Sequence, residues 1–376
     1  MPDLTLTIDP VEAARRLAPT AAELAPAAER DRQLAEPLVS ALADAGLFRL
    51  CVPAAAGGLE AHPGTLVAAV RALAAGDAAA GWCVAIAATS GLVAGYLPEA
   101  AAREIYADPA TVVAGVFAPR GRATPEDGGF RVGGRWPFAS GCRHADWLMG
   151  GCVVDGGMRL MLAPAAQYTI HDTWHVMGLR ATGSHDIELD GVFIPAERTA
   201  DVLGDPLQSG PLYAFPLFGL LALAIAAVSL GIARGALDDL IALAGGKVPT
   251  GGKRTLAERG TVQAEVARAE AAVRAASALL DESIGAAWER AVAGAGVDVE
   301  QRAALRLAAT HATAVSTHAT DTAYTLAGGS ALYESSPLQR RVRDAHAVTQ
   351  HMLVAPATWE LTGRVLLGMP TDATQL

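Results

Sequence analysis

The 376-residue chain carries a formal net charge of −10, and 52% of its residues are hydrophobic whereas 18% are charged. A chain of this length favours two or three domains, or one large composite fold, over a single simple core. The acidic balance, without any basic block, argues against a general attraction for nucleic acid or anionic lipid.

The N-terminal stretch MPDLTLTIDP starts acidic and has no apolar core, which argues against a secretory signal peptide. The four cysteines form no CxxC pair, and we expect them to be buried thiols in a reducing cytoplasm. The nine histidines show no spacing typical of a metal site, so we expect no bound metal.

Two kinds of pattern divide the first 200 residues. Apolar residues recur at spacings of three and four through residues 9–105, which predicts an N-terminal helical region. The pattern changes near Pro109, and residues 111–200 consist of short β-branched or alternating runs separated by Gly, Pro and Asp. These runs predict a β-domain of seven or eight short strands.

From about residue 210 the pattern is helical again. Four long helices are predicted at 211–245, 255–292, 299–327 and 337–367, separated by segments rich in Gly, Pro or Ser. Long helices with short connections predict an up-and-down four-helix bundle. Residues 206–233 are uncharged and long enough to span a membrane, which is one interpretation, but their Ala, Gly and Pro content favours a helix buried in the bundle.

Several common cofactor and catalytic motifs do not match this sequence. No GxGxxG follows a predicted strand, and no GxSxG is present. The segment GGKVPTGGKRT departs from a P-loop at Lys247 and Arg254. The sequence therefore favours neither a Rossmann nucleotide site, nor a P-loop, nor a serine-hydrolase elbow.

Three segments carry more specific signals. They are RWPFASGCRHADWLMGG (135–151), WHVMGLRATGSHDIELDGVFIPAER (174–198) and GGSALYESSPLQRRVRDAHAVTQH (328–351). Taken singly, they also fit a packed hairpin, a tight turn and a helix with Arg–Asp pairs on its surface. The first segment gathers aromatic rings, a serine and glycines, a composition that suits a planar ligand.

These segments, together with ALADAGLFRLCVPAAAGGLEA (41–61) and AVSLGIARGALDDLIALA (227–244), resemble in this order the acyl-CoA dehydrogenase superfamily. The resemblance is closest to its flavin-dependent monooxygenase branch, the oxygenase components of two-component systems, and it covers nearly the whole chain. It implies an α+β fold with an N-terminal α-helical domain (1–108), a middle β-barrel or sandwich domain (109–205) and a C-terminal four-helix bundle (206–376).

The resemblance also implies a flavin site in the middle domain. Trp136, Phe138 and Ser140 would line the isoalloxazine ring, and Gly141 would let the backbone come close to it. Ser140 is also a predicted catalytic residue, because a hydroxyl near flavin N5 and O4 can form a hydrogen bond there. Ala139 stands where related phenol hydroxylases have the first serine of FSSG, which leaves the contact to flavin N5 open.

The flavin phosphates need cations or helix N-termini. The residues that the resemblance suggests for them are Arg254, Arg259, Gln263, Gly328, Gly329, Arg340, Arg341 and Arg343. In the family such residues often reach the flavin of a neighbouring subunit, which implies a homotetramer or at least a dimer. The alternative for each arginine is an ion pair with a nearby carboxylate.

The sequence lacks the catalytic glutamate that acyl-CoA dehydrogenases use as a base, and this absence favours an oxygenase over a dehydrogenase. Met352 and Leu221 occupy the two positions at which acyl-CoA dehydrogenases carry a catalytic glutamate. By the resemblance, His351 instead donates a proton near the flavin and converts a C4a-peroxide into an electrophilic C4a-hydroperoxyflavin, because imidazole titrates near neutrality. The alternative is a helix histidine bonded to a neighbouring carbonyl.

A second departure concerns the substrate. Ser90 lies eight residues after Trp82, where related phenol hydroxylases often carry a histidine. Serine is a poor base, so a substrate contacted by Trp82, Ser90 and His351 need not be a phenol that must lose its proton. An indole, another electron-rich arene, an amine or a sulfur heterocycle fits as well.

We therefore predict a cytoplasmic, homo-oligomeric flavin-dependent monooxygenase that uses O2 to hydroxylate a small aromatic or heteroaromatic substrate. Its reduced FMN or FAD would come from a separate NAD(P)H:flavin reductase, since the sequence has no nicotinamide-binding motif. Three alternatives stay open: an acyl-CoA dehydrogenase or oxidase with an unrecognised base, an N- or S-oxygenase on the same fold, and a ligand-binding scaffold without enzymatic activity.

Overall fold

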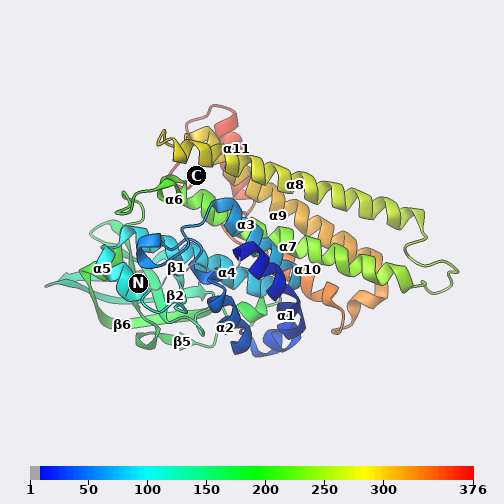
Figure 1. Cartoon of the computed structure of the whole chain (residues 1–376), viewed down its shortest axis with the longest axis horizontal. Helices are drawn as coiled ribbons and strands as arrows, with labels where there is room; N and C mark the ends of the chain where they lie inside the picture. The colour runs from blue at the N-terminus through cyan, green and yellow to red at the C-terminus, as the bar shows by residue number, and fades with distance from the viewer. Residues whose placement is uncertain (1–8) are drawn as a thin grey trace. The chain divides into compact units, whose positions relative to one another are not determined.

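The structure is a computed structural model that describes residues 9–376, and these residues group into two compact units (Figure 1). The first unit comprises residues 9–69, then Trp82–Val176 and Arg180–Ala214. The second comprises Val70–Gly81, Met177–Leu179 and Phe215–Leu376. Most N-terminal helices thus share a unit with the β-domain, while the division at residues 108 and 205 stays a prediction.

The N-terminal region is helical, as its apolar spacing predicts. Its α-helices are α1 (Pro10–Asp31), α2 (Glu36–Asp44), α3 (Pro63–Gly76), α4 (Ala78–Ser90) and α5 (Glu99–Ile105). Asp9 caps α1 by accepting hydrogen bonds from the backbone of Val11 and Glu12, and Pro10 stands at the first helical position. Asp77 caps α4 in the same way through the Ala80 N–H. These caps fix where the helices begin.

Within residues 9–376, seven strands form one mixed sheet in the order β5-β6-β2-β1-β3-β4-β7. Their bounds are β1 (Val113–Glu126), β2 (Gly129–Ala139), β3 (Trp147–Val154), β4 (Gly157–Pro164), β5 (Thr169–His171), β6 (His185–Pro195) and β7 (Thr199–Ala200). The β1–β3 pair is parallel and the other pairs are antiparallel. The sheet curls around a common core, because β4 also contacts β6 although the two are not neighbours in it.

The C-terminal region is a helical bundle (Figure 1). Its helices are α7 (Leu217–Gly246), α8 (Gly260–Val292), α9 (Val299–Ala327), α10 (Pro337–Val348) and α11 (Ala357–Leu366), preceded by the short α6 (Pro211–Ala214). Helix α9 packs on α7, α8, α10 and α11. The predicted helix 211–245 is wrong in one respect, because Pro216 separates α6 from α7.

The prediction of one helix over 337–367 is also wrong. Helix α10 ends at Val348, a series of turns follows, and α11 begins after Pro356. His351 therefore lies in a turn and not in a helix. The predicted start of the second bundle helix at residue 255 is also too early, since α8 begins at Gly260.

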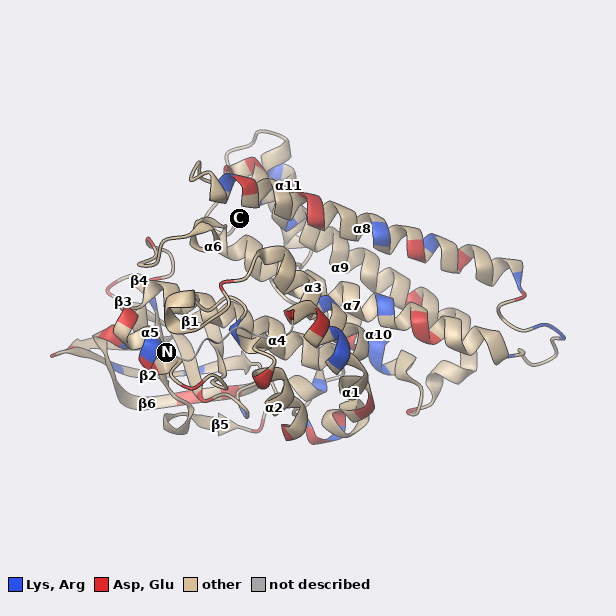
Figure 2. Ribbon diagram, in the orientation of Figure 1, with Lys and Arg blue, Asp and Glu red and all other residues tan. Residues whose placement is uncertain are grey.

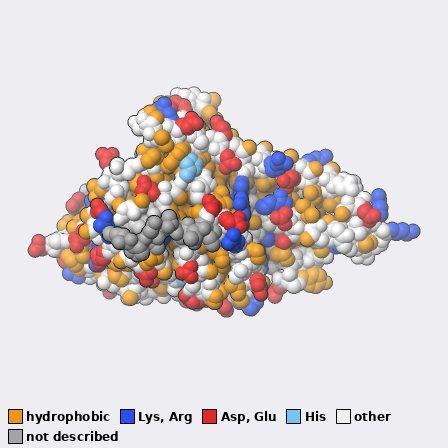
Figure 3. Space-filling view, viewed as in Figure 1, with side chains coloured by type: hydrophobic (Ala, Val, Ile, Leu, Met, Phe, Trp, Pro, Cys, Tyr) orange, Lys and Arg blue, Asp and Glu red, His pale blue; other side chains and the backbone are white. Residues whose placement is uncertain are grey.

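Among the residues that the structure describes, two stretches are long and apolar enough to cross a membrane, Ala78–Tyr96 and Leu217–Gly246. Their apolar windows are 94% and 78% buried inside the protein, as the interior helices of a folded core would be. On the face shown in Figure 3, acidic and basic side chains are intermixed among apolar ones.

Candidate functional site

A bulge in β2 places Phe138 on the surface. The pairing of β2 with β6 shifts between Trp136 and Ala139, so that Pro137 and Phe138 lie opposite a single residue of β6. Phe138 has a φ of 68°, a left-handed conformation that is rare for an aromatic residue, and its side chain is 65% exposed. The ring of Trp174 meets it edge to face, with centroids 6.0 Å apart. We call this pair of rings, of which Phe138 is exposed and Trp174 is half-buried, the aromatic corner.

A chain of hydroxyl groups lies directly behind the bulge. The indole N–H of Trp82 donates to Ser140 Oγ over 2.9 Å. Ser140 Oγ lies 2.7 Å from Ser184 Oγ, which lies 2.6 Å from Thr182 Oγ1. The Gly141 N–H donates to the Thr182 carbonyl over 2.8 Å. The buried Ser140 hydroxyl thus already forms hydrogen bonds with Trp82 and Ser184. To contact a flavin as predicted, it would have to bond to the flavin in addition to these partners or in place of one of them.

Trp136 does not belong to the aromatic corner. It is fully buried, and its indole N–H donates to the Gly151 carbonyl over 2.7 Å. A Cβ added at Gly121, Gly134 or Gly150 would lie only 2.2, 3.1 or 2.5 Å from the ring. The prediction that Trp136 lines a flavin is therefore corrected: glycines and sheet residues enclose the ring, and it stabilises the core.

His351 lies in the turns after α10, within the second unit. Its Nδ1 accepts a hydrogen bond from the Leu353 N–H over 3.3 Å, which leaves the proton of the neutral ring on Nε2. Burial, with a smaller contribution from the positive charge of Arg306, lowers the pKa of His351 to about 4. The proton-donor role predicted from sequence requires an imidazole pKa near neutrality. In the structure the ring is instead a neutral N–H donor at physiological pH.

The Arg–Asp motif of α10 holds a short backbone segment. Asp344 accepts a hydrogen bond from the Leu179 N–H over 2.6 Å, and Leu179 has a left-handed φ of 52°. Arg343 donates to the Met177 carbonyl over 2.6 Å. A Cβ at Gly178 would lie 2.1 Å from the Arg343 carbonyl oxygen, so only glycine fits there. The motif therefore fixes the Met177–Leu179 segment.

Asp344 provides a test of this arrangement by pH. Burial, with a contribution from Asp77, raises its pKa to about 7, although the Leu179 N–H and two arginines oppose the shift. Because the folded pKa lies above the unfolded value, Asp344 stabilises the fold fully below pH 4 and progressively less as the pH rises to 7. The side chain of Asp344→Asn carries no charge at either pH, so the variant escapes this loss. We expect the free energy of unfolding of the variant minus that of wild type to rise by about 2–4 kcal/mol between pH 4 and pH 8.

Urea denaturation at several pH values measures this difference. Asp281→Asn, at an exposed site on α8, serves as the control and should give a profile parallel to wild type. A parallel profile for Asp344→Asn would contradict the interpretation.

The connection between α7 and α8 (Figure 2) carries two of the residues predicted to bind the flavin phosphates. Arg254 and Arg259 line a hollow of about 280 Å³ together with Lys253 and the Pro249–Gly252 turn. Gln263 donates a side-chain hydrogen bond to the Ala257 carbonyl over 2.8 Å and so supports this connection.

The other predicted phosphate contacts lie on α10 and at the end of α9. Arg341 pairs with Asp239 over 2.5 Å, and Arg343 bonds to Gln339 and Met177, so these two have protein partners. Gly328 has a left-handed φ of 55° at the end of α9. Gly328 and Gly329 precede Ser330, which lines a second hollow of about 430 Å³ with Ser335 and Ser336. Arg340 is nearly buried on α10.

Comparison with known proteins decides the family. The family model described as "Acyl-CoA dehydrogenase, N-terminal domain" matches residues 11–105, and "Acyl-CoA dehydrogenase, C-terminal domain" matches residues 223–356. An indole-3-acetate monooxygenase from Pseudomonas putida is 36% identical over 346 residues, which cover 90% of this chain and 89% of that protein. The chain belongs to the acyl-CoA dehydrogenase family, in its flavin-dependent monooxygenase branch.

Further members of this branch support the assignment. The oxygenase component of an FADH2-dependent resorcinol hydroxylase from Rhizobium is 31% identical, covering 90% of this chain and 88% of that protein. The crystal structure of a 3-HSA hydroxylase from Rhodococcus sp. RHA1 superposes with a TM-score of 0.92 at 28% identity, covering 98% of this chain and 100% of that one. The structure of XiaF from Streptomyces with FADH2 has a TM-score of 0.89 at 28% identity, covering 96% and 95%.

These comparisons confirm the predicted fold, the flavin dependence and the monooxygenase class. The name "oxygenase component" also implies a separate flavin reductase in such systems. The residues present suit a flavin: the exposed ring of Phe138 suits a planar ring, and a hollow lined by arginines suits phosphate. Trp174, Thr182 and Ser184 are not among the predicted site residues, although all three lie in the segment 174–198.

Proposed function

We propose that this protein hydroxylates a small aromatic or heteroaromatic substrate and that an indole carrying an acidic side chain is the first candidate. Two indole-3-acetate monooxygenases, from Pseudomonas putida and Acinetobacter baumannii, are 36% and 34% identical to this chain over about nine-tenths of its length. Ser90 agrees with a substrate that need not lose a phenolic proton. The observation that carries the proposal is the aromatic corner, because an exposed ring in a strained backbone conformation is costly unless it binds a partner.

The residues of the aromatic corner, the hydroxyl chain and His351 have defined tasks in this proposal. A bound reduced flavin supplies the electrons and activates O2. Phe138 and Trp174 pack against its ring, and the hydroxyl chain from Ser140 orders the bulge behind them. His351 offers its Nε2–H as a hydrogen-bond donor. Trp82 and Ser90 are retained as residues of the substrate site.

Phosphate binding completes the proposal. Arg254, Arg259 and Gln263 hold the flavin phosphates together with Gly328, Gly329 and Arg340. As in the family pattern, they would act on the flavin of a second subunit, which makes the working form a homo-oligomer, most simply a tetramer. We place the protein in the cytoplasm, with a separate NAD(P)H:flavin reductase as its partner; all four cysteines are buried free thiols.

A reconstituted assay tests the function. The protein is combined with a flavin reductase, NADH, O2 and either FMN or FAD, and is offered indole-3-acetate, indole, resorcinol and a dialkyl sulfide. A hydroxylated indole product supports the proposal, and the more effective flavin identifies the cofactor. Product from the sulfide alone would instead make it an S-oxygenase. Bleaching of a tightly bound flavin by an acyl-CoA, without any oxygenated product, would overturn it.

Replacement of Arg254 tests phosphate binding. We expect Arg254→Ala to raise the Kd for reduced flavin about tenfold, because a charge-assisted hydrogen bond to phosphate is lost, and to reduce the salt dependence of binding. Anaerobic titration measures both. Arg268→Ala is the matched control, since Arg268 lies on α8 and pairs with Glu265 at the surface. Equal affinities for the two variants would remove Arg254 from the site.

A further inference from the structure

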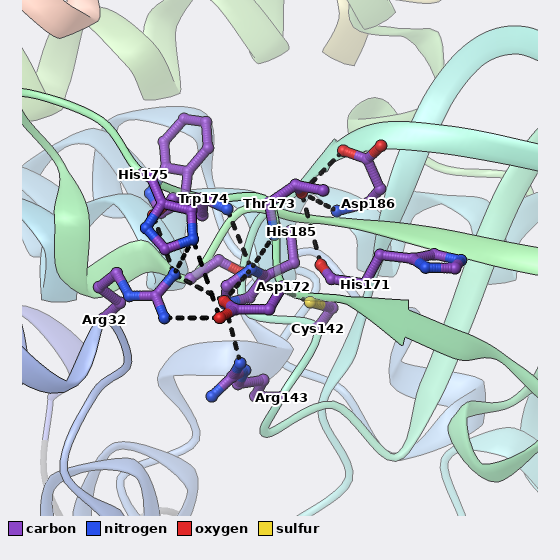
Figure 4. Close-up of polar contacts among 11 residues, drawn as sticks. Arg32, Cys142, Arg143, His171, Asp172, Thr173, Trp174, His175, His185 and Asp186 are labelled. Atoms are coloured by element: carbon purple, nitrogen blue, oxygen red, sulfur yellow. Dashed lines mark hydrogen bonds and ion pairs between the residues drawn. The ribbon is translucent and has the colours of Figure 1, made fainter.

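His185 is a fully buried histidine beside the aromatic corner, in the first unit (Figure 4). It is the first residue of β6 and pairs with Ala139, the residue at which β2 resumes its register after the bulge. The TGSHD segment that contains it is predicted from sequence only as part of a turn. The proposed function so far assigns it no role.

The imidazole ring holds two consecutive backbone amides. Nδ1 lies 3.2 Å from the N–H of Thr173 and 3.2 Å from the N–H of Trp174, and Figure 4 shows the ring pointing at both. An atom that accepts two N–H groups carries no proton, so the ring proton is on Nε2. Nε2 is buried and has no hydrogen-bond partner within the described part of the chain. The buried Nε2–H therefore stays without a partner in the described part of the chain, while Nδ1 accepts hydrogen bonds from two backbone N–H groups.

The charges around His185 keep it in this accepting form. Asp172 Oδ1 lies 3.5 Å from Nδ1, but the same carboxylate is held by Arg32 at 2.6 Å and by Arg143 at 3.5 Å. Burial first, and then the positive charge of Arg143, lower the pKa of His185, while Asp172 opposes them. The neutral ring is therefore favoured at physiological pH.

Both sides of the aromatic corner meet at this one residue. Its backbone pairs with the end of the bulge that carries Phe138, and its side chain fixes the backbone of Trp174. Thr173 is tied a second time, because its hydroxyl donates to Asp186 and accepts the Asp186 N–H. The orientation of the Trp174 ring against Phe138 thus depends on an acceptor at the position of Nδ1.

We propose that His185 is a positioning residue, which sets the Trp174 side of the aromatic corner through its Nδ1 acceptor and so determines how tightly reduced flavin binds and how much oxygen reaches the substrate. This inference rests on the proposed function. It assigns His185 no contact with flavin or substrate. The property that matters is the position of the acceptor and not the charge or size of the ring.

Two amide replacements isolate the acceptor. His185→Asn places an amide oxygen near the position of Nδ1, whereas His185→Gln places it near that of Nε2, and His185→Leu supplies none. We expect His185→Leu and His185→Gln to raise the Kd for reduced flavin about tenfold and to lower the ratio of product to H2O2 at saturating flavin at least about fivefold. His185→Asn should stay within about twofold of wild type. His171→Asn, on the neighbouring β5, is the matched control and should be unchanged.

A double-mutant cycle with Phe138 adds a readout that general destabilisation would not move. In a Phe138→Ala background, His185→Gln should change the Kd and the product ratio by less than about twofold, because the corner is already lost. Equal effects of His185→Asn and His185→Gln, or full additivity with Phe138→Ala, would overturn the inference. Should His185→Leu fail to fold, the two amide variants still decide it. A wild-type protein that oxygenates no substrate refutes the proposed function instead.

Discussion

Replacement of His351 by alanine is expected to lower the rate of product formation about 100-fold while reduced flavin is still oxidised and H2O2 accumulates. The reason is the loss of the Nε2–H donor, which the hydrogen bond from Leu353 to Nδ1 fixes in place. Product and H2O2 are measured together under steady reduction of the flavin. His351→Gln keeps an N–H donor of similar reach and should recover part of the coupling.

The pH profile of the wild-type enzyme tests the same point independently. Because the pKa of His351 is lowered to about 4, its protonation changes only at acidic pH. The ratio of product to H2O2 should therefore be flat between pH 6 and 8. It should fall as the pH decreases towards 4, because a proton on Nδ1 breaks the hydrogen bond from the Leu353 N–H that holds the ring in place. An inflection near pH 6.5 that disappears in His351→Ala would show that the ring works as a cationic acid and would contradict the neutral-donor role.

The largest effect on stability is expected at Trp136. Trp136→Ala should lower the free energy of unfolding by about 3–5 kcal/mol, because it removes a fully buried ring and the hydrogen bond to Gly151. Urea denaturation measures the loss. The flavin affinity of the fraction that stays folded should change little, since the ring is enclosed by the sheet.

Phe138→Gly is the matched control for this prediction. Glycine accepts a φ of 68° without strain, so the variant should keep its stability within about 1 kcal/mol of wild type. It should nevertheless bind reduced flavin more weakly, because the exposed ring is gone. The interpretation fails if Trp136→Ala is as stable as wild type, or if Phe138→Gly binds flavin normally.

The contrast between these two residues shows how far the sequence could predict the site. The family resemblance predicts both rings against the flavin, and in a regular strand Trp136 and Phe138 would indeed share one face. The bulge between Trp136 and Ala139 separates them and sends one ring inward and the other outward. Pro137, which cannot donate to the strand ladder, was the only local signal, and it does not say which ring moves.

The sequence predicts the helical and strand regions correctly but not the points at which two of the helices are interrupted. Long apolar periodicities and loops rich in Gly, Pro and Ser led to the helical regions and to the run of short strands. Pro216 and Pro356, which precede α7 and α11, were not given enough weight as breakers. His185 and the lowered pKa of His351 depend on burial and on contacts made only in the folded chain, which no local pattern contains.

The packing of Trp136 against three glycines also constrains how this protein can change over generations. A side chain at Gly150 or Gly121 collides with the indole, so such a mutation is accessible only after position 136 has become smaller. A smaller residue at position 136, in turn, leaves a cavity that lowers the stability of the fold unless a larger neighbouring side chain fills it. We therefore expect substitutions at positions 121, 134, 136 and 150 to occur together in evolution. A mutant library made to change the substrate range should contain more folded variants if these four positions are left unmutated.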